Sequence, residues 1–237
     1  MARDLLERLR DGEVLIDTGP IHTLFEQETG RNLEGHLSEW IVNHPNEFQS
    51  VVKAQFAAGC DFGTPGTQGN GRYRLREFGL EDRLYELTLK QVQLAKEVTP
   101  ENCYLVGHLG MTGRFLEPVG DMTVDELYKS FVEQIIPMLE AGADVVGALC
   151  GDIARPIGNA LTTVKEMRQS CDKPLSIRPD AGLAQLIDGK IVQPLTPEEM
   201  AREAPGWIAA GASIVGGYCG TSLEHIKAIT AAAKGKK

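Results

Sequence analysis

The chain has 237 residues, of which 42% are hydrophobic and 24% are charged, and its formal net charge is −9. This length and composition are typical of one globular domain with a sizeable core, so residues 1–237 are taken as a single domain. The acidic balance argues against a nucleic-acid or anionic-membrane surface, because both attract clustered positive charge.

The sequence carries no sign of export or membrane insertion. Its start, MARDLLERLRDG, lacks the apolar core of a signal peptide, and no apolar run approaches the ~20 residues of a membrane span. Five scattered cysteines do not indicate a disulfide framework. We therefore expect a cytoplasmic protein without nucleic-acid or membrane partners, whose thiols serve packing, metal binding or catalysis. Whether it forms a homo-oligomer is left open.

Short apolar runs alternate with amphipathic stretches along the chain. The pattern predicts strands at 14–16, 60–62, 103–106, 145–149, 174–177 and 212–215. It predicts helices at 4–10, 45–58, 80–97, 123–140, 157–169, 197–210 and 223–233. Residues 21–38 are expected to be irregular, and 187–194 to form a surface hairpin. Thr123 with Glu126, and Thr196 with Glu199, have the spacing of a capping box.

The same helix-to-strand junction occurs three times along the chain. Gly59, Gly142 and Gly211 each end a helix just before an apolar strand. Regular helix–strand alternation indicates a parallel sheet, either a closed barrel or an open doubly wound sheet. No GxGxxG follows the first strand, so a dinucleotide site is unsupported and no bound nucleotide is expected. We predict an α/β fold, a parallel (β/α) barrel of the TIM type, with six clear βα units where a closed barrel has eight.

Ligands of parallel βα proteins lie at the carboxyl ends of the strands. The predicted strand ends carry Asp17, Gly19, the loop 63–71, His108, Cys150, Asp152, Asp180, Tyr218 and Cys219. The other cysteines fall elsewhere: Cys60 and Cys103 at strand starts, and Cys171 in a helix-to-strand loop. Position therefore separates Cys150 and Cys219 from the other three.

The residue types at these ends allow several kinds of chemistry. Cys150 and Cys219 either share a zinc ion, which favours thiolate ligands, or are two unrelated buried cysteines. His108 is a ligand, an acid–base group or a polar residue at a loop start, and Asp17 orients a substrate amine or caps the following loop. The loop 63–71 lacks the Lys-Ser/Thr pair of a phosphate-binding loop, so it is interpreted as a substrate-side loop.

Five segments carry a more specific signal: AAGCDF, YRLREFGLEDRLYELTLKQVQLAKE, GHLGMTG, RPDAGLAQLIDGKIVQPLTPEEMA and GGYCGTSLEHIKAI. Together they resemble the homocysteine S-methyltransferase family over nearly the whole chain. In that family three cysteines bind zinc, and zinc holds the homocysteine sulfur for methyl transfer. The resemblance implies that Cys150 and Cys219 are zinc ligands and catalytic residues. Tyr218 stands where the family has another zinc cysteine, so a further ligand is needed: Tyr218, His108 or Asp152.

The resemblance also implies substrate contacts from Asp17, Gly19, His108 and Tyr218. The middle of the chain is short by about two βα units of the family barrel, including a Glu-Thr strand end that helps to bind the amino acid. The implied activity is methyl transfer between a small donor and a homocysteine-like thiol or a corrinoid protein. Nothing resembles an adenosylmethionine domain or a cobalamin-binding module, so the donor comes from solution or from a separate corrinoid protein.

Two other functions are considered. The first is a non-catalytic relative that lost the metal and serves as a binding or assembly subunit. The tyrosine at 218 and the shortened middle of the chain favour this function. The second is a barrel enzyme that uses Asp17, His108 and Asp180 for acid–base work on another substrate.

Overall fold

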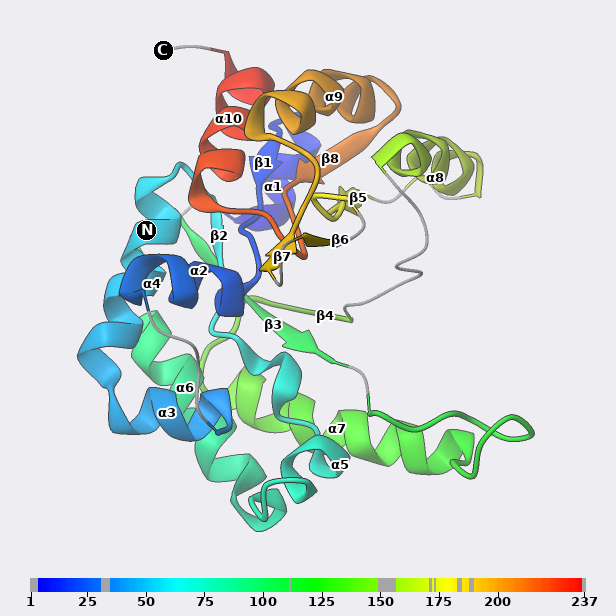
Figure 1. The fold of residues 1–237 in the computed structure, drawn as a ribbon. Helices are drawn as coiled ribbons and strands as arrows, with labels where there is room; N and C mark the ends of the chain where they lie inside the picture. Colours follow the sequence, from blue (N-terminus) through cyan, green and yellow to red (C-terminus); the bar gives the residue numbers. More distant parts are fainter. Residues whose placement is uncertain are drawn as a thin grey trace.

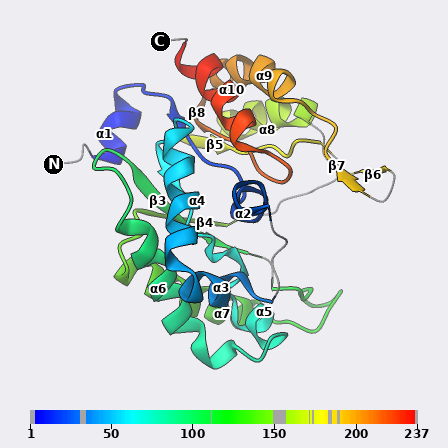
Figure 2. The ribbon, with the colours of Figure 1, turned by 60° about the vertical axis from the view of Figure 1, so that its left-hand side comes forward.

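A computed structural model describes residues 4–30, 35–110, 112–148, 157–170, 172, 174–182, 185–187 and 190–235. Strands lie inside and helices pack against their outer sides (Figures 1 and 2). None of the helices in the described ranges combines the length and apolar character needed to cross a membrane.

The described strands form two parallel sheets and one antiparallel hairpin. Their bounds are β1 Leu15–Ile16, β2 Phe62–Gly63, β3 Tyr104–Leu109, β4 Val145–Ala148, β5 Leu175–Ile177, β6 Gln185–Ile187, β7 Lys190–Val192 and β8 Ala212–Val215. The parallel sheets have the orders β1-β8-β5 and β2-β3-β4, and β6 pairs with β7 in the expected surface hairpin.

The two parallel sheets join into one open arc. The Asp61 amide, just before β2, donates to the Ile16 carbonyl of β1 at 2.8 Å, and the Ile16 amide donates to the Asp61 carboxylate at 2.8 Å. The resulting order is β5-β8-β1-β2-β3-β4. The α/β class and the parallel sheets are thus confirmed. Closure is not seen: β4 and β5, at the two ends of the arc, do not pair in the described part of the chain.

Helices follow most strands and cover the outside of the arc. Their bounds are α1 Leu5–Arg10, α2 Ile21–Thr29, α3 Leu37–Asn43, α4 Pro45–Ala57, α5 Arg72–Arg76, α6 Leu84–Lys96, α7 Val124–Glu140, α8 Ile157–Ser170, α9 Pro197–Ala209 and α10 Leu223–Lys234. Both predicted capping boxes, at the starts of α7 and α9, are present. Helices α8 and α9 pack beside β5 and β8, whereas α4, α6 and α7 pack beside β2 and β3.

Three sequence predictions need correction. Residues 21–38 are not irregular throughout, because α2 occupies 21–29 and α3 begins at Leu37; Ile21, Leu24 and Phe25 have helical spacing and are buried. The expected helix 80–97 starts later, at Leu84, after a short 3₁₀ turn. The third strand runs to 109 rather than 106, which places His108 inside a strand instead of in a loop.

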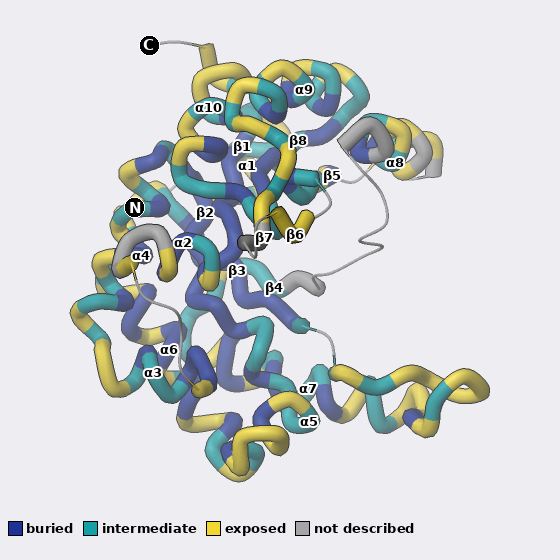
Figure 3. Tube along the Cα trace, in the orientation of Figure 1, coloured by how far each residue is buried: buried dark blue, intermediate teal, exposed yellow. Residues whose placement is uncertain are grey.

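The core follows the two sheets. One buried cluster surrounds Trp207 of α9 and packs it against β8 and α10. A second is built from α2, α3, α4, α6, β3 and α7 and includes Phe48 and Met138. Figure 3 shows the buried residues continuing along β2 and β3 between the more exposed outer helices. The arc therefore has a packed interior although its two end strands do not pair.

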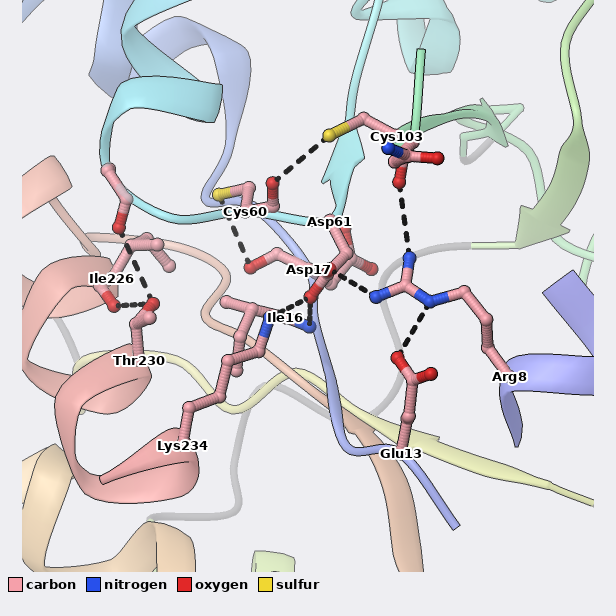
Figure 4. A network of polar contacts seen from close by, with 12 residues as sticks. Arg8, Glu13, Ile16, Asp17, Cys60, Asp61, Cys103, Ile226, Thr230 and Lys234 are labelled. Atoms are coloured by element: carbon pink, nitrogen blue, oxygen red, sulfur yellow. Dashed lines mark hydrogen bonds and ion pairs between the residues drawn. The ribbon is translucent and has the colours of Figure 1, made fainter. Parts of the chain in front are cut away.

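A polar network at the amino end of the strands joins the first and last parts of the chain (Figure 4). The Asp61 carboxylate accepts from Arg8 of α1 at 2.9 Å and forms an ion pair with Lys234 of α10. Cys60 and Cys103 lie beside this network, ahead of β2 and β3. The predicted strands began at these two cysteines, whereas β2 begins two residues after Cys60 and β3 one residue after Cys103. Burial raises the pKa of the Cys60 thiol, so this thiol is kept protonated. These residues belong to the structural end of the arc.

Candidate functional site

The carboxyl ends of β1, β3 and β8 meet around the side chain of Arg178, which directly follows β5. Its guanidinium reaches residues from all three of these strand ends. The side chain is 10% exposed, so it forms part of the floor of this end of the arc. This is the end where ligands of parallel βα proteins bind.

Each nitrogen of the Arg178 guanidinium has a defined partner. Nη2 donates to the Thr18 carbonyl at 3.0 Å and Nε to the Gly217 carbonyl at 3.3 Å. Nη1 donates to Nε2 of His108 at 2.5 Å. The guanidinium also lies 5.6 Å from the centre of the Tyr218 ring, at cation–π distance. Arg178, which follows β5, thus contacts residues at the ends of β1, β3 and β8.

These contacts fix the protonation of His108. An arginine can only donate, so Nε2 of His108 must accept, and Nδ1 carries the proton that it donates to Oγ1 of Thr64 at 3.0 Å. Burial, and then the positive charge of Arg178, lower the pKa of His108 well below its ordinary value. His108 is therefore a neutral imidazole with both nitrogens engaged.

Asp17 lies beside the same guanidinium and is almost completely buried. Its Oδ2 is 3.4 Å from Nε of Arg178, and its Oδ1 accepts from the Thr18 amide at 2.7 Å. Burial raises the pKa of Asp17, while the charge of Arg178 and the Thr18 bond partly offset that rise. Two residues further on, Gly19 leaves room for Thr221: a Cβ at Gly19 would lie 3.0 Å from Oγ1 of Thr221.

Cys219 and Asp180 are joined by a hydrogen bond from backbone to side chain, next to a backbone bond that extends the contact between the ends of β5 and β8. The Cys219 amide donates to Oδ1 of Asp180 at 3.0 Å, and the Ala181 amide donates to the Cys219 carbonyl at 2.9 Å. Partial burial raises the pKa of Asp180, against the hydrogen bonds from Cys219 that lower it. The Cys219 thiol is half-buried, unlike that of Cys60. A thiol and a carboxyl group thus lie side by side near the floor that Arg178 forms.

The loop 63–71 forms a packed wall of the site. Oγ1 of Thr67 accepts from the His108 amide at 2.8 Å and donates to its carbonyl at 3.0 Å. A Cβ at Gly110 would lie 1.9 Å from the Gln68 carbonyl oxygen, so β3 and the loop can approach this closely only with a glycine there. The loop therefore supports His108 from one side.

The structure brings together most of the residues predicted from the sequence. Those that meet near Arg178 are Asp17, Gly19, His108, Asp180, Tyr218 and Cys219. Cys150, Asp152 and Cys171 lie outside the described residues. Arg178 was not predicted as a member of this cluster, because a single arginine after a strand forms no recognisable sequence pattern. The weak signal available was its place beside Asp180 at a strand end.

The described residues supply part of a zinc site. Among them, no group of three histidine, cysteine or acidic side chains is close enough to hold a metal ion. Cys219 and Asp180 form a pair with sulfur and oxygen donors, both of which zinc accepts. His108 would have to give up a hydrogen bond to serve as a ligand. A complete site therefore needs at least one donor from outside the described ranges, and Cys150 is the predicted one.

A parallel α/β arc whose ionisable groups gather at the carboxyl ends of its strands has the scaffold of a barrel enzyme. The sequence profile described as Homocysteine S-methyltransferase matches residues 14–150 and 146–233. The chain belongs to the homocysteine S-methyltransferase family. The predicted resemblance is confirmed.

The relatives agree with this assignment. The methionine synthases of Mycobacterium leprae (strain TN) and Mycobacterium tuberculosis (strain ATCC 25618 / H37Rv) are each 24% identical over 97% of this chain, which spans 25% of their length. The alignment runs over 302 positions, more than this chain has residues, so the relatives carry segments without a counterpart here.

Solved structures show the same fold. The homocysteine methyltransferase MmuM from Escherichia coli, in its metallated form, has a TM-score of 0.78 at 18% identity, over 96% of this chain and 99% of that one. Its apo form has a TM-score of 0.70 at 16% identity, over 97% and 98% of the two chains. These likenesses support the fold alone. The two pieces of the family match overlap at residues 146–150, a range that begins within β4.

Proposed function

We propose that this chain transfers a methyl group to the sulfur of homocysteine at the site around Arg178. The observation that carries the proposal is the family match over 14–233, together with Cys219 at the same strand-end floor as Asp17 and His108. The substrate follows from the family and from the names of the relatives. The donor in this proposal is a small molecule or a methylated corrinoid protein.

We further propose that Cys150 and Cys219 hold a zinc ion, with the Asp180 carboxylate as an oxygen donor beside Cys219. Zinc would lower the pKa of the incoming thiol and so supply the substrate sulfur as a thiolate. That a relative, MmuM, exists in a metallated form supports a metal here. Tyr218 is not needed as a ligand in this arrangement, because its ring lies against the Arg178 guanidinium.

The chain's own residues orient the reactants. The homocysteine thiol gives its proton to water, and the thiolate attacks the methyl carbon in line with the bond to the donor. That bond breaks, and its electron pair leaves with the donor. Asp17 is placed to accept the substrate ammonium group. His108, fixed as a neutral imidazole, keeps Arg178 in position rather than exchanging a proton, since both of its nitrogens are engaged. Positioning of this kind lowers the entropic part of the barrier.

A non-catalytic binding subunit remains the alternative, and two observations favour it. Tyr218 stands where the resemblance places a zinc cysteine, and the arc is open between β4 and β5 in the described part of the chain. Such a relative would bind a partner without holding zinc or transferring a methyl group. Metal content and methyl transfer therefore separate the two functions directly.

The test compares the wild type with Cys219→Ser, Cys150→Ser and a matched control, Cys103→Ser, which changes a thiol at the structural end of the arc. Zinc is measured by elemental analysis after reducing, metal-replete purification. Methylated homocysteine is measured with free methylcobalamin and with small S-methyl donors. We expect stoichiometric zinc and turnover in the wild type and the control, and loss of both in the other two variants. Turnover with no zinc would overturn the zinc site, and neither zinc nor turnover in the wild type would favour the binding subunit.

A further inference from the structure

We propose that Arg178 binds the carboxylate of the acceptor, so that the site selects an amino-acid thiol over a thiol without a carboxylate. The inference rests on the proposed function, which it deepens by assigning a specificity-determining residue. It begins from the donors of Arg178. A guanidinium has five N–H groups in a planar fork. Its hydrogen bonds to Thr18, Gly217 and His108 use three, one on each nitrogen.

The remaining two N–H groups, one on each terminal nitrogen, have no partner in the described part of the chain. A planar fork with donors to spare suits a carboxylate, which accepts on two oxygens. Arg178 is also the one lysine or arginine in the described strand-end segments 17–20, 63–71, 108–110, 178–182 and 216–221. Within these described segments, Arg178 is therefore the one positively charged partner for an entering carboxylate.

The charge balance favours a zwitterion. Oδ2 of Asp17 lies 3.4 Å from Nε of Arg178, so the floor presents one negative and one positive group next to each other. A free amino acid carries one ammonium and one carboxylate group. When the carboxylate meets Arg178 and the ammonium meets Asp17, no net charge is buried, which avoids the cost of an unpaired charge. A simple aminothiol would leave the positive group of the floor without its partner.

Arg178 is also close to the place proposed for the sulfur. It precedes Asp180 by two residues, and its Nε donates to Gly217, two residues before Cys219. The Asp180 carboxylate in turn accepts from the Cys219 amide at 3.0 Å. The same two strand ends therefore carry the carboxylate-binding group and the thiol. The Tyr218 ring lies against the guanidinium and limits how far it can turn.

The experiment measures binding of L-homocysteine and of 3-aminopropane-1-thiol, which lacks the carboxylate, to zinc-loaded protein by calorimetry. The variants are Arg178→Met, which keeps the length and removes the charge, and Arg178→Lys, which keeps the charge and loses the fork. The matched control is Arg168→Met, because Arg168 also donates to a backbone carbonyl, that of Gly211 at 2.8 Å, away from the site. Thermal unfolding of each variant checks that it is folded.

We expect the wild type and Arg168→Met to bind homocysteine more tightly than the aminothiol, on the order of 10- to 100-fold. Arg178→Met loses that preference because only homocysteine binding weakens, and Arg178→Lys recovers part of it. Equal weakening of both ligands, or an unchanged preference, in folded Arg178→Met overturns the inference while leaving the proposed function intact. A wild type that neither binds nor methylates homocysteine overturns the proposed function itself.

Discussion

At the scale of single residues, the neutral state of His108 helps to fix the position of Arg178. Its Nδ1 donates to Thr64 and its Nε2 accepts from Arg178, so a second proton would break the bond to the arginine and place two positive charges together. Burial and the charge of Arg178 make protonation of His108 unfavourable, and its pKa is lowered for this reason. Arg178 and His108 therefore stabilise each other only above the pH at which the imidazole is charged.

This coupling predicts a pH dependence of stability. The unfolded chain takes up a proton near the ordinary histidine pKa of about 6.5, whereas folded His108 does not. The free energy of unfolding should therefore fall as pH drops from about 7 to about 5. His22 and His36 contribute in the same direction, because burial lowers the pKa of each. His108→Gln should show a smaller fall than the wild type in urea titrations at the two pH values. An equal fall would mean that His108 takes up its proton freely in the folded protein.

For single residues, the sequence predicts a position in the fold when that position follows from the local strand pattern. The strand-end positions of Asp17 and Cys219 were predictable because each follows a short apolar run, whereas their roles stay predictions. Arg178 was not found, because its importance comes from a contact with His108, seventy residues earlier, which no local pattern records.

At the scale of elements, the ends of β1 and β8 approach each other closely because β8 is followed by a glycine. A Cβ at Gly216 would lie 2.8 Å from the Asp17 carbonyl oxygen and 3.0 Å from its carbonyl carbon. Both are backbone atoms that cannot turn away as a flexible side chain could. The position of Asp17 in the site thus depends on the glycine at position 216, which has no side chain to push β1 and β8 apart.

Two alanine substitutions test this dependence. Gly216→Ala should lower the free energy of unfolding by about 1–3 kcal/mol through overpacking, and should weaken homocysteine binding by displacing Asp17. Gly206→Ala, inside α9 with no atom within 4 Å of the added Cβ, should instead raise stability by about 0.5–1 kcal/mol. Chemical denaturation measures the free energy of unfolding of both variants. Similar effects of the two changes would show that β1 and β8 have room to separate.

Elements were predictable when their signals were local. The capping boxes of α7 and α9 fixed two helix starts, because the residues that satisfy the free amides lie within one turn. Helix α2 was missed because its buried residues Ile21, Leu24 and Phe25 stand among polar ones, and packing rather than propensity stabilises it.

On the scale of the whole molecule, Asp61 links parts of the chain that are far apart in sequence. Its carboxylate accepts from Arg8 of α1 and from the Ile16 amide of β1, and it pairs with Lys234 of α10 (Figure 4). The Asp61 and Arg8 side chains are 10% and 12% exposed, so this pairing is largely shielded from water. In the described part of the chain the end strands of the arc do not pair, and this network connects its first and last helices at the base.

Removal of this carboxylate should therefore be costly. Asp61→Ala leaves the Arg8 guanidinium without that partner and the Ile16 amide without its acceptor, so the free energy of unfolding should fall by about 3–5 kcal/mol. Glu224→Ala, which breaks an exposed pair with Lys227, should change it by less than about 1 kcal/mol. Thermal and urea unfolding report both values. A loss below about 1 kcal/mol for Asp61→Ala would show that the network does not hold the arc together.

The architecture was predictable up to the closure of the barrel. Counting βα units gave six, and the structure arranges six parallel strands in one arc. The count could not say where the opening lies, because strand neighbours are set by pairing between distant residues. In the described part of the chain, the two end strands that do not pair are β4 and β5, which precede and follow α8 in the sequence.

The most direct test of the central proposal is zinc X-ray absorption on the metal-loaded protein, with and without homocysteine. The proposal predicts two sulfur atoms at about 2.3 Å from zinc in the free protein, from Cys150 and Cys219, and three after homocysteine is added. An unchanged sulfur count on addition of homocysteine, or a zinc ion with no sulfur neighbours, would contradict it.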